Sequence, residues 1–383
     1  MISEDLLARV ACPVCLEEAG CPSCAAPGGG HGACADYARR ARCGCGGPDK
    51  RPLSREETGL RCPCCGALYA LHAEAGYVDL APAGPLGEGT HYESHEFQER
   101  LTVTDAPPML SARIKADMMR RMLALGRDDH VLDLGCGAGK LALFARGGAA
   151  GAAGVDVAPF FLARAAREVD LVRGDLRRLP FRKGAYPRAY TLDVLEHLDE
   201  GGVSDVLVEA RRVVGPQGRL FVYTHAMESS ALARFQRAVN RLARALGERG
   251  LIDHEREAMR KSDHRNAIRS HEHFDSLCAE AGLRVAERRY YNVVAKAVVE
   301  DLLLRLVEQA RRRGRKDPGP HAHGAGEEAP PAGTRVGAPA PGRMAMAAAR
   351  ALTLLLRLDV ALFGRVRTGP FFGLLVPRGA EPR

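Results

Sequence analysis

The sequence predicts an α/β protein built on a doubly wound, Rossmann-like sheet and preceded by a small cysteine-rich module. Three observations predict this fold. A short apolar strand at His130–Leu134 runs directly into closely spaced glycines and then into a helical pattern. Further short strands follow, several of them ending on an aspartate, and helical patterns separate them. Finally, ten of the twelve cysteines lie before residue 66, which sets the N-terminal region apart from the rest.

The first strand and its glycine turn carry the strongest functional signal. Val131, Leu132 and Leu134 form an apolar run that is too short for a helix and is typical of a buried strand. The glycines that follow allow a tight turn and the close approach of a ligand. A strand, a glycine turn and a helix N-terminus together form a nucleotide cradle in an open α/β sheet. Taken alone, the glycine pattern fits a purely structural turn equally well.

Four more strands are expected in order along the chain, at Gly151–Val157, Leu171–Asp175, Ala189–Val194 and Gly218–Thr224. Because helical patterns separate them, these strands should lie parallel in a doubly wound sheet. The strand at Gly151 reaches Asp156 about 20 residues after the glycine turn, where an acidic side chain can hold ribose hydroxyls.

Three further motifs give the chain a family resemblance. Gly174–Phe181 reads Gly-Asp-Leu-Arg-Arg-Leu-Pro-Phe, Asp193–His197 reads Asp-Val-Leu-Glu-His, and Arg212–Gly218 forms a Val-Val-Gly-Pro-Gln-Gly turn. With the glycine turn and Asp156, they stand in the order found in class I S-adenosylmethionine-dependent methyltransferases of the type 11 group. The chain resembles this family over about Tyr92–Asn292, with a return at the C-terminus. The resemblance implies a seven-stranded, Rossmann-like methyltransferase sheet.

The resemblance also implies how S-adenosylmethionine would be bound. Asp133 and the glycine loop approach its methionine part, and Asp156 holds the ribose. Asp175 and the backbone near it meet the adenine amino group, while Asp193 borders the methyl-transfer pocket. Because this cofactor has no pyrophosphate, its loop needs an acidic residue near the sulfonium and ammonium charges, and Asp133 fits that requirement. The predicted cofactor-binding residues are Asp133, Gly135, Cys136, Gly137, Gly139, Asp156, Val157, Asp175, Leu176 and Asp193.

Glu196 and His197 invite comparison with a general base, since histidine titrates near neutral pH and can accept a proton from a hydroxyl nucleophile. A pocket-wall or helix-capping role is the favoured alternative, because the same dipeptide recurs in methyltransferases with very different substrates. The sulfonium is already activated, so positioning supplies much of the rate. No catalytic residue is assigned from the sequence.

The N-terminal region contains two Cys-x-x-Cys knuckles, Cys12–Cys15 and Cys62–Cys65. Four thiolates paired in this way suit a closed tetrahedral zinc site, with Cys12, Cys15, Cys62 and Cys65 as the predicted ligands. The segments around them resemble the zinc ribbon of the small activator proteins of tRNA and protein methyltransferases. A redox-active Cys-x-x-Cys is the rival interpretation. The insert between the knuckles could bind a second zinc ion through Cys21, Cys24, His31, Cys34, Cys43 and Cys45, whose pairing the sequence leaves open.

The chain divides into four predicted segments. We expect a zinc-ribbon domain with its cysteine-rich insert at 1–82 and a methyltransferase domain at 83–310. The Pro-, Gly- and Ala-rich tract at 311–343 is typical of a disordered linker, inserted into that domain. An apolar helix and a reversed final strand at 344–383 would complete the methyltransferase domain.

The composition of the chain limits where in the cell the protein is expected and what it can bind. The chain opens without a basic, apolar leader, and it has no run of roughly 18 apolar residues, so no spanning helix is expected and a cytoplasmic location is predicted. Arginines at helical spacing within 234–244 could face a phosphate-rich partner or a membrane surface, or simply solvent. The apolar helices at 298–307 and 352–363 would flank one another and cover the pocket or offer an apolar surface to a lipid-like acceptor, although helix packing explains the same residues. Peripheral membrane contact stays open.

The predicted function is methyl transfer from S-adenosylmethionine to a small-molecule or lipid-like acceptor, by O-, N- or C-methylation. The net charge of +8 and a pI near 9.0 keep rRNA or tRNA methylation as an alternative, although aromatic residues make up only 5% of the chain and tryptophan is absent. A non-catalytic, partner-binding scaffold is the third hypothesis. The acceptor atom, the use of a general base and the oligomeric state stay open.

Overall fold

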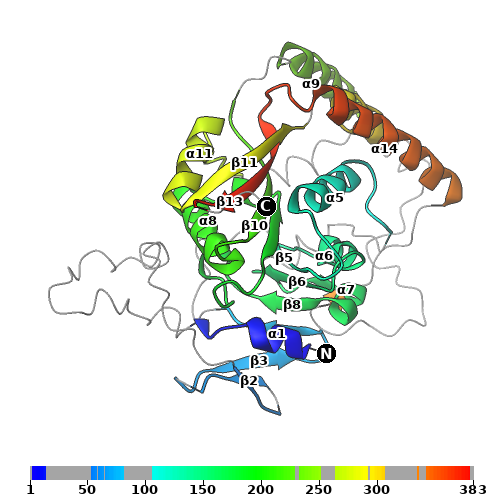
Figure 1. Ribbon diagram of the computed structural model, residues 1–383. Helices are drawn as coiled ribbons and strands as arrows, with labels where there is room; N and C mark the ends of the chain where they lie inside the picture. The colour runs from blue at the N-terminus through cyan, green and yellow to red at the C-terminus, as the bar shows by residue number, and fades with distance from the viewer. Residues whose placement is uncertain are drawn as a thin grey trace.

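The computed structural model describes residues 2–13, 53–57, 59–63, 65–81, 106–228, 233–251, 264–291, 294–306, 334–335 and 342–379. One sheet runs through this part of the chain, in the strand order β1-β2-β3-β4-β8-β6-β5-β9-β10-β13-β11 (Figure 1). Its central parallel strands are β8 (Asp170–Arg173), β6 (Gly151–Asp156), β5 (His130–Leu134), β9 (Arg188–Leu192) and β10 (Arg219–His225). The chain thus turns to opposite sides of β5, as a doubly wound sheet requires.

The far edge of the sheet is completed by a strand from the C-terminal region. β13 (Pro370–Pro377) lies antiparallel between β10 and β11 (Leu283–Tyr290). The reversed strand expected near the C-terminus is therefore present, and its Phe371 and Phe372 are fully buried.

The seven strands that the sequence predicts are present as β8, β6, β5, β9, β10, β13 and β11, but within the described residues the sheet continues to eleven strands. The four additional strands come from the N-terminal region: β1 (Ser54–Arg55), β2 (Gly59–Arg61), β3 (Leu68–His72) and β4 (Tyr77–Asp79). They form an antiparallel meander, and β4 then pairs in parallel with β8, through Val78 and Val172 among others. Backbone groups at the edge of β8 thereby gain partners that a bare sheet edge would lack.

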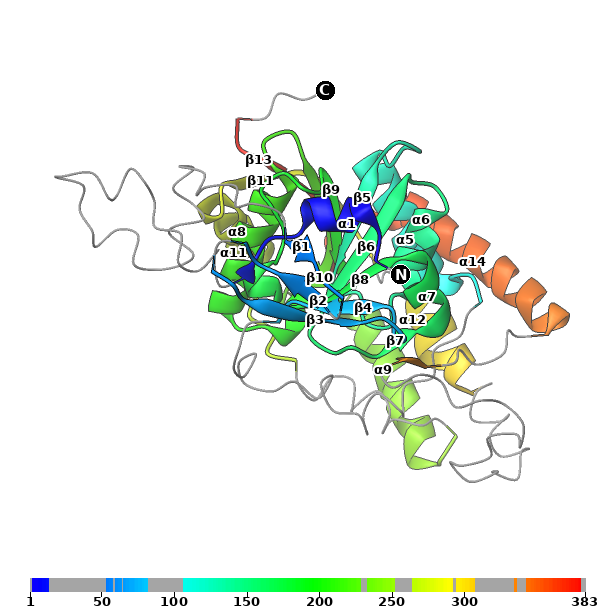
Figure 2. The same ribbon diagram turned by 90° about the horizontal axis from the view of Figure 1, so that it is seen from below.

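Helix α1 (Glu4–Arg9) also docks on this edge (Figure 2). The Ser3 side chain caps α1 by accepting a hydrogen bond from the Leu6 amide at 3.0 Å, and its hydroxyl donates to Asp170 at 2.5 Å. Leu6 and Val10 are fully buried in the same core as the central strands. The N-terminal segment is therefore continuous with the α/β core in both its sheet and its packing.

Two apolar cores, one on each face, hold the helices to the sheet. Helices α5 (Leu110–Leu123), α6 (Lys140–Arg146) and α7 (Ala163–Glu168) cover one face, and α8 (Glu200–Val214) and α11 (His271–Glu280) cover the other (Figure 1). Strand β5 serves both cores, because Val131 belongs to one and Leu132 and Leu134 belong to the other. This explains its continuous apolar run, since a parallel strand is covered on both sides.

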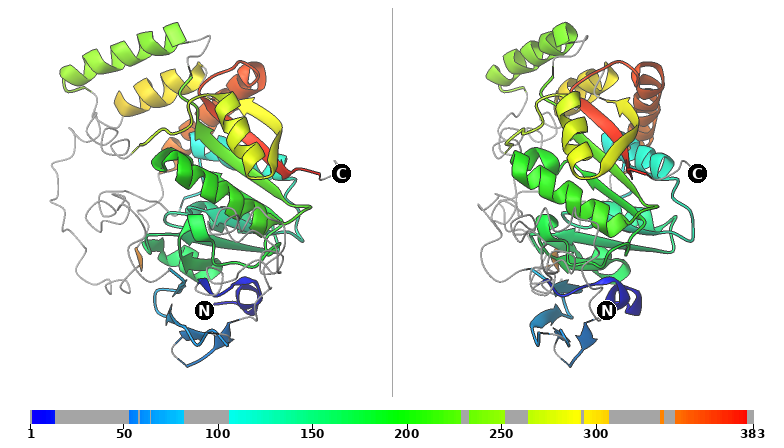
Figure 3. Two further views of the ribbon diagram at one scale, coloured as in Figure 1. Left: turned by 90° about the vertical axis from the view of Figure 1, so that its left-hand side faces the viewer. Right: turned by 60° about the vertical axis from the view of Figure 1, so that its left-hand side comes forward.

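A group of helices lies at the end of the molecule opposite the N-terminal strands (Figure 3). It consists of α9 (Ala233–Glu248), α12 (Ala295–Val298) with the π-helical turn η4 (Val299–Leu304), and α14 (Arg343–Phe363). Helix α14 packs on α5, where Arg357 pairs with Asp117 and the Thr353 hydroxyl accepts a hydrogen bond from the Leu110 amide. None of the described helices is both long and apolar enough to cross a membrane.

The short remaining elements are β7 (Phe161–Leu162) paired with β12 (Thr334–Arg335), and the 3-10 turns η2 (Leu176–Arg178) and η3 (Leu195–His197). Most of the predicted linker lies outside the described residues. The same holds for Cys15 and for all six candidate ligands of a second zinc ion.

Candidate active site

The glycine turn after β5 adopts a backbone that favours glycine. Gly135, Gly137 and Gly139 have φ values of +81°, +52° and +75°, all in the left-handed region. A Cβ atom on Gly135 would lie 2.4 Å from Val194 Cγ2, so this position is filled by packing. At Gly137, in contrast, a Cβ atom would meet nothing within 4 Å. The middle of the turn therefore faces open space next to the sheet, as a ligand cradle requires.

Asp156 holds this turn from the next strand. Its carboxylate accepts hydrogen bonds from the amide of Gly137 at 2.7 Å and from the amide of Ala158 at 3.0 Å. An acidic side chain at the tip of β6 therefore lies beside the open position of the glycine turn. Cys136 serves the packing of the same turn, because a Cβ atom on Gly154 would lie only 2.7 Å from its sulfur.

The Asp133 side chain is buried and is not exposed at the glycine turn. The side chain is 3% exposed, and its Oδ2 accepts a hydrogen bond of 2.9 Å from the Tyr190 hydroxyl. Removal from water raises the pKa of Asp133 to about 8, the Tyr190 hydrogen bond opposes that rise, and the nearby charge of Asp156 adds to it. In the free protein the buried carboxyl group is therefore mostly protonated at neutral pH.

This raised pKa makes a testable prediction about stability. Between the ordinary pKa of 3.8 and the native value of about 8, the native state keeps a proton that the unfolded state has released. The stability contributed by Asp133 is then complete below about pH 4 and is lost as the pH rises to about 8. We expect the unfolding free energy of the wild type to fall relative to Asp133→Asn by up to about 1.4 kcal/mol per pH unit. Urea unfolding of both proteins at several pH values checks this, and parallel pH profiles would contradict it.

Asp175 at the tip of β8 is engaged by its own chain. Its carboxylate accepts a hydrogen bond from the Arg177 amide at 2.8 Å, which caps η2, and it forms an ion pair with the Arg177 guanidinium at 2.8 Å. The neighbouring Leu176 is 8% exposed, and the Val157 carbonyl accepts a hydrogen bond from Arg173 at 3.1 Å. The predicted contacts of Asp175, Leu176 and Val157 with an adenosine therefore stay predictions.

A charged cluster lies at the carboxyl ends of β9 and β10. Asp193 follows β9 with a left-handed φ of +55°, a strained conformation for a residue other than glycine. Its carboxylate pairs with Lys115 of α5, whose ammonium lies 4.1 Å from the centre of the Tyr223 ring. Partial removal from water raises the pKa of Asp193, whose side chain is 46% exposed, but the charge and hydrogen bond of Lys115 and the charges of His225 and Lys296 bring the pKa below its usual value. Asp193 is thus the anionic centre of a mainly basic group.

Glu196 and His225 form a second pair in the same region. Glu196 is 3% exposed, and its Oε2 accepts a hydrogen bond of 3.1 Å from the Thr224 hydroxyl. His225 Nδ1 lies 3.5 Å from Glu196 Oε1, and the His225 side chain is 34% exposed. His197 is placed differently, because its ring packs edge-on against His264 at 4.7 Å. The structure therefore associates Glu196 with His225, which the sequence did not single out.

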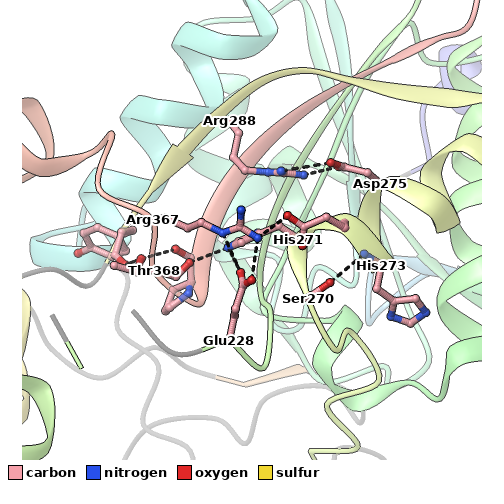
Figure 4. A network of polar contacts seen from close by, with 11 residues as sticks. Glu228, Ser270, His271, His273, Asp275, Arg288, Arg367 and Thr368 are labelled. Carbon is pink, nitrogen blue, oxygen red and sulfur yellow. Dashed lines mark hydrogen bonds and ion pairs between the residues drawn. The ribbon is translucent and has the colours of Figure 1, made fainter. Parts of the chain in front are cut away.

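A network of ion pairs fastens the C-terminal return beside this cluster (Figure 4). Arg367 pairs with Glu228, which follows β10, and with Glu272 of α11. The buried His271 ring lies 2.8 Å from the Thr368 carbonyl oxygen, while the Thr368 hydroxyl donates to the Tyr291 carbonyl at 2.9 Å. The segment between α14 and β13 is held in this way against the carboxyl end of β10.

Three cysteine thiols converge in the N-terminal module. The sulfur atoms of Cys12, Cys62 and Cys65 all lie within 4.8 Å of one another, and none of the three is in a disulfide. Cys12 and Cys62 are each 1% exposed, and the Tyr69 hydroxyl lies 2.9 Å from the Cys12 sulfur. Of the four predicted metal ligands, the structure brings together the three that it describes.

The family described as "Methyltransferase domain" matches residues 131–218 of this chain. Residues 131–218 make up 88 of the 383 residues of the chain. They include the glycine turn, Asp156, Asp175, Asp193 and Glu196, so the predicted S-adenosylmethionine-dependent methyltransferase is confirmed through this domain. No curated protein matches the chain significantly.

The chain also matches solved structures of known methyltransferases. Phosphoethanolamine N-methyltransferase 2 of Haemonchus contortus, in complex with S-adenosyl-L-methionine, is 14% identical with a TM-score of 0.41. That match covers 77% of this chain and 61% of the other. Geranyl diphosphate C-methyltransferase of Streptomyces coelicolor A3(2) is 14% identical with a TM-score of 0.35, covering 78% and 90%. Both TM-scores lie below 0.5, so neither match bears on the acceptor.

Proposed function

We propose that this methyltransferase acts on a small-molecule or lipid-like acceptor, bound at the carboxyl ends of β9 and β10. The observation that carries the proposal is the adjacency of two sites. The open glycine turn with Asp156 lies at the ends of β5 and β6, and the cluster around Asp193 and His225 lies at the ends of the next two strands. This edge, where the strand order reverses, is where open α/β sheets bind their ligands.

The residues at the glycine turn fit S-adenosylmethionine. Gly137 leaves space for close approach, and the Asp156 carboxylate, which can accept hydrogen bonds from ribose hydroxyls, lies beside it. The buried Asp133 supplies a carboxyl group whose ionised form a nearby cation would favour. When bound, the cofactor supplies a methyl group already activated on a sulfonium centre.

His225 is the group best placed to take up a proton from the acceptor. Its ring is partly exposed at the end of β10, and Glu196 lies against its Nδ1 side. At 3.5 Å the Glu196 carboxylate forms no hydrogen bond with Nδ1, but it lies on the side of the ring away from Nε2 and can orient the imidazole for proton transfer. His225 would therefore receive the acceptor's proton at Nε2, while Glu196 acts as a positioning residue that Thr224 in turn holds.

The surroundings of the cluster favour an acceptor of limited size. Lys115 comes from α5 and Lys296 from α12, so two helices contribute basic side chains to the cluster at the carboxyl ends of β9 and β10. The Tyr223 and Tyr291 rings, 6.0 Å apart, are buried in the core next to this cluster, and the Tyr291 hydroxyl shares a hydrogen bond of 2.6 Å with Ser111.

A labelling experiment tests the acceptor class. The purified chain is incubated with S-adenosylmethionine labelled on the methyl carbon and an extract from which RNA can be separated. We expect the label in the small-molecule or lipid fraction, and Asp156→Ala should reduce it. Label that enters RNA and is removed by ribonuclease would replace this proposal with the alternative of rRNA or tRNA methylation. An intact methyltransferase site that transfers no label to any fraction would support the scaffold hypothesis.

For the N-terminal module, the proposal includes a structural zinc ion held by Cys12, Cys15, Cys62 and Cys65. Three of these thiols already lie within reach of a single ion, and Tyr69 adds a polar contact. Elemental analysis of the native protein should find about one zinc per chain. Cys62→Ser should lose the metal and unfold at a lower temperature, whereas Cys278→Ser, a buried thiol of α11, should keep the metal. A zinc-free native protein would contradict this site, and a second equivalent would implicate the cysteine-rich insert.

A further inference from the structure

Helix α14 carries an apolar face that is turned away from the protein. Thr353, Leu356 and Asp359 are buried on the inner side of the helix, against the rest of the molecule. On the outer side, Leu354, Leu358 and Leu362 recur every four residues and are 61%, 54% and 65% exposed. A spacing of four places these leucines one above the other on a helix. The outer apolar face comprises Met344, Ala347, Ala348, Ala351, Leu354, Leu355, Leu358, Ala361 and Leu362.

The charges beside this apolar face are positive. Arg343, Arg350 and Arg357 follow one another every seven residues along one side of α14 and are exposed, although Arg357 is paired with Asp117 of α5, so Arg343 and Arg350 supply the positive charge beside the apolar face. The only acidic residue of the helix, Asp359, is 5% exposed and lies on the inner side. An apolar stripe with an adjoining row of cations is the pattern of a helix that lies in a membrane interface.

Helix α9 adds a second basic surface at the same end of the molecule. Val239 and Ala243 are buried on its inner side. Exposed arginines occupy its outer side, opposed by a single glutamate at its last position; they are Arg234, Arg237, Arg241 and Arg244. Both α9 and α14 contact α12, and Figures 1 and 3 show them together at the end farthest from the N-terminal strands.

We propose that the outer faces of α14 and α9 bind the surface of an anionic lipid bilayer. A lipid surface satisfies both features at once, because its acyl region accepts the leucines and its headgroups neutralise the arginines. A second copy of this chain fits the charges less well, since pairing α14 with its own copy would bring like-charged arginine rows together without exposed acids on the helix to offset them. At roughly 30 Å the helix is suited to lying along such a surface.

Vesicle flotation with the full-length chain tests this proposal. We expect the protein to float with vesicles in which roughly one third of the phosphatidylcholine is replaced by phosphatidylglycerol, and to float much less with phosphatidylcholine alone or at high salt. Leu358→Glu should weaken vesicle binding by roughly tenfold or more. Leu68→Glu is the matched control, because Leu68 is 61% exposed on β3 at the opposite end of the molecule and should bind as the wild type does.

Three results would overturn the proposal. The wild type could fail to float with either type of vesicle, or Leu358→Glu could bind as well as Leu68→Glu. Equal binding to phosphatidylcholine alone would remove the assigned role of the arginines. A wild-type dimer that Leu358→Glu dissociates, with no vesicle binding, would instead identify the α14 face as an interface between copies. Melting temperature and S-adenosylmethionine binding of both variants confirm that each is folded.

Discussion

Gly137→Ala should weaken S-adenosylmethionine binding by about tenfold or more while the chain stays folded, at a strain cost of about 1–2 kcal/mol. A Cβ atom at this position meets no protein atom within 4 Å, so it projects into the space assigned to the cofactor. The backbone amide of residue 137 persists in the variant and can still donate to Asp156. Isothermal titration measures the affinity, and urea unfolding measures the stability.

Gly135→Ala provides the contrasting case in the same turn. Its Cβ atom would lie 2.4 Å from Val194 Cγ2 at a φ of +81°, so we expect a stability loss of about 2–4 kcal/mol. Val194→Ala in the same chain should restore part of that loss by removing the clashing methyl group. For the Gly137→Ala variant, S-adenosylmethionine binding as tight as that of the wild type would show that the cofactor does not bind at this glycine turn.

His225→Asn should lower kcat by about 100-fold or more on the acceptor identified by labelling, because it removes the proposed proton acceptor. The KM for S-adenosylmethionine should change little, since the Glu196–His225 pair lies on the acceptor side. Glu196→Gln should lower kcat by a smaller factor, about tenfold, because it disturbs only the orientation and charge stabilisation of the ring.

His197→Asn is the matched control for this prediction. His197 follows Glu196 directly in the chain, yet its ring packs on His264 instead of joining the pair. Its replacement should leave kcat within about threefold of the wild type. A large loss of kcat in His197→Asn, with full activity in His225→Asn, would contradict this assignment. The proton acceptor would then be His197, in the Glu196-His197 dipeptide that the sequence singles out.

The sequence predicts the central fold well because the relevant signals are local. The apolar run of β5, the left-handed glycines after it and the aspartate at the tip of β6 each depend on neighbouring residues. The extension of the sheet to eleven strands depends instead on a distant pairing. Strand β4 has only three residues, and these residues do not indicate that the strand pairs with β8, almost a hundred residues later in the chain.

Several contacts within the candidate site could not be predicted from the sequence, because they too join residues that are distant along the chain. Tyr190 and Asp133 lie opposite each other on adjacent strands, so their hydrogen bond could be anticipated only once the register of β5 and β9 was known. Lys115 reaches Asp193 from a helix that precedes the whole sheet core. His225 had one weak local signal, its position at the carboxyl end of a predicted strand. The aspartates at strand tips were found because that position alone marks the ligand-binding edge.

Binding of S-adenosylmethionine at the glycine turn held by Asp156 can be measured by calorimetric titration of the purified full-length protein. We expect binding at about one site per chain, and a loss of at least about tenfold in affinity for Asp156→Ala with its fold intact. A zinc-loaded, folded wild type that shows no heat of binding, or an Asp156→Ala variant that binds as tightly as the wild type, would contradict it.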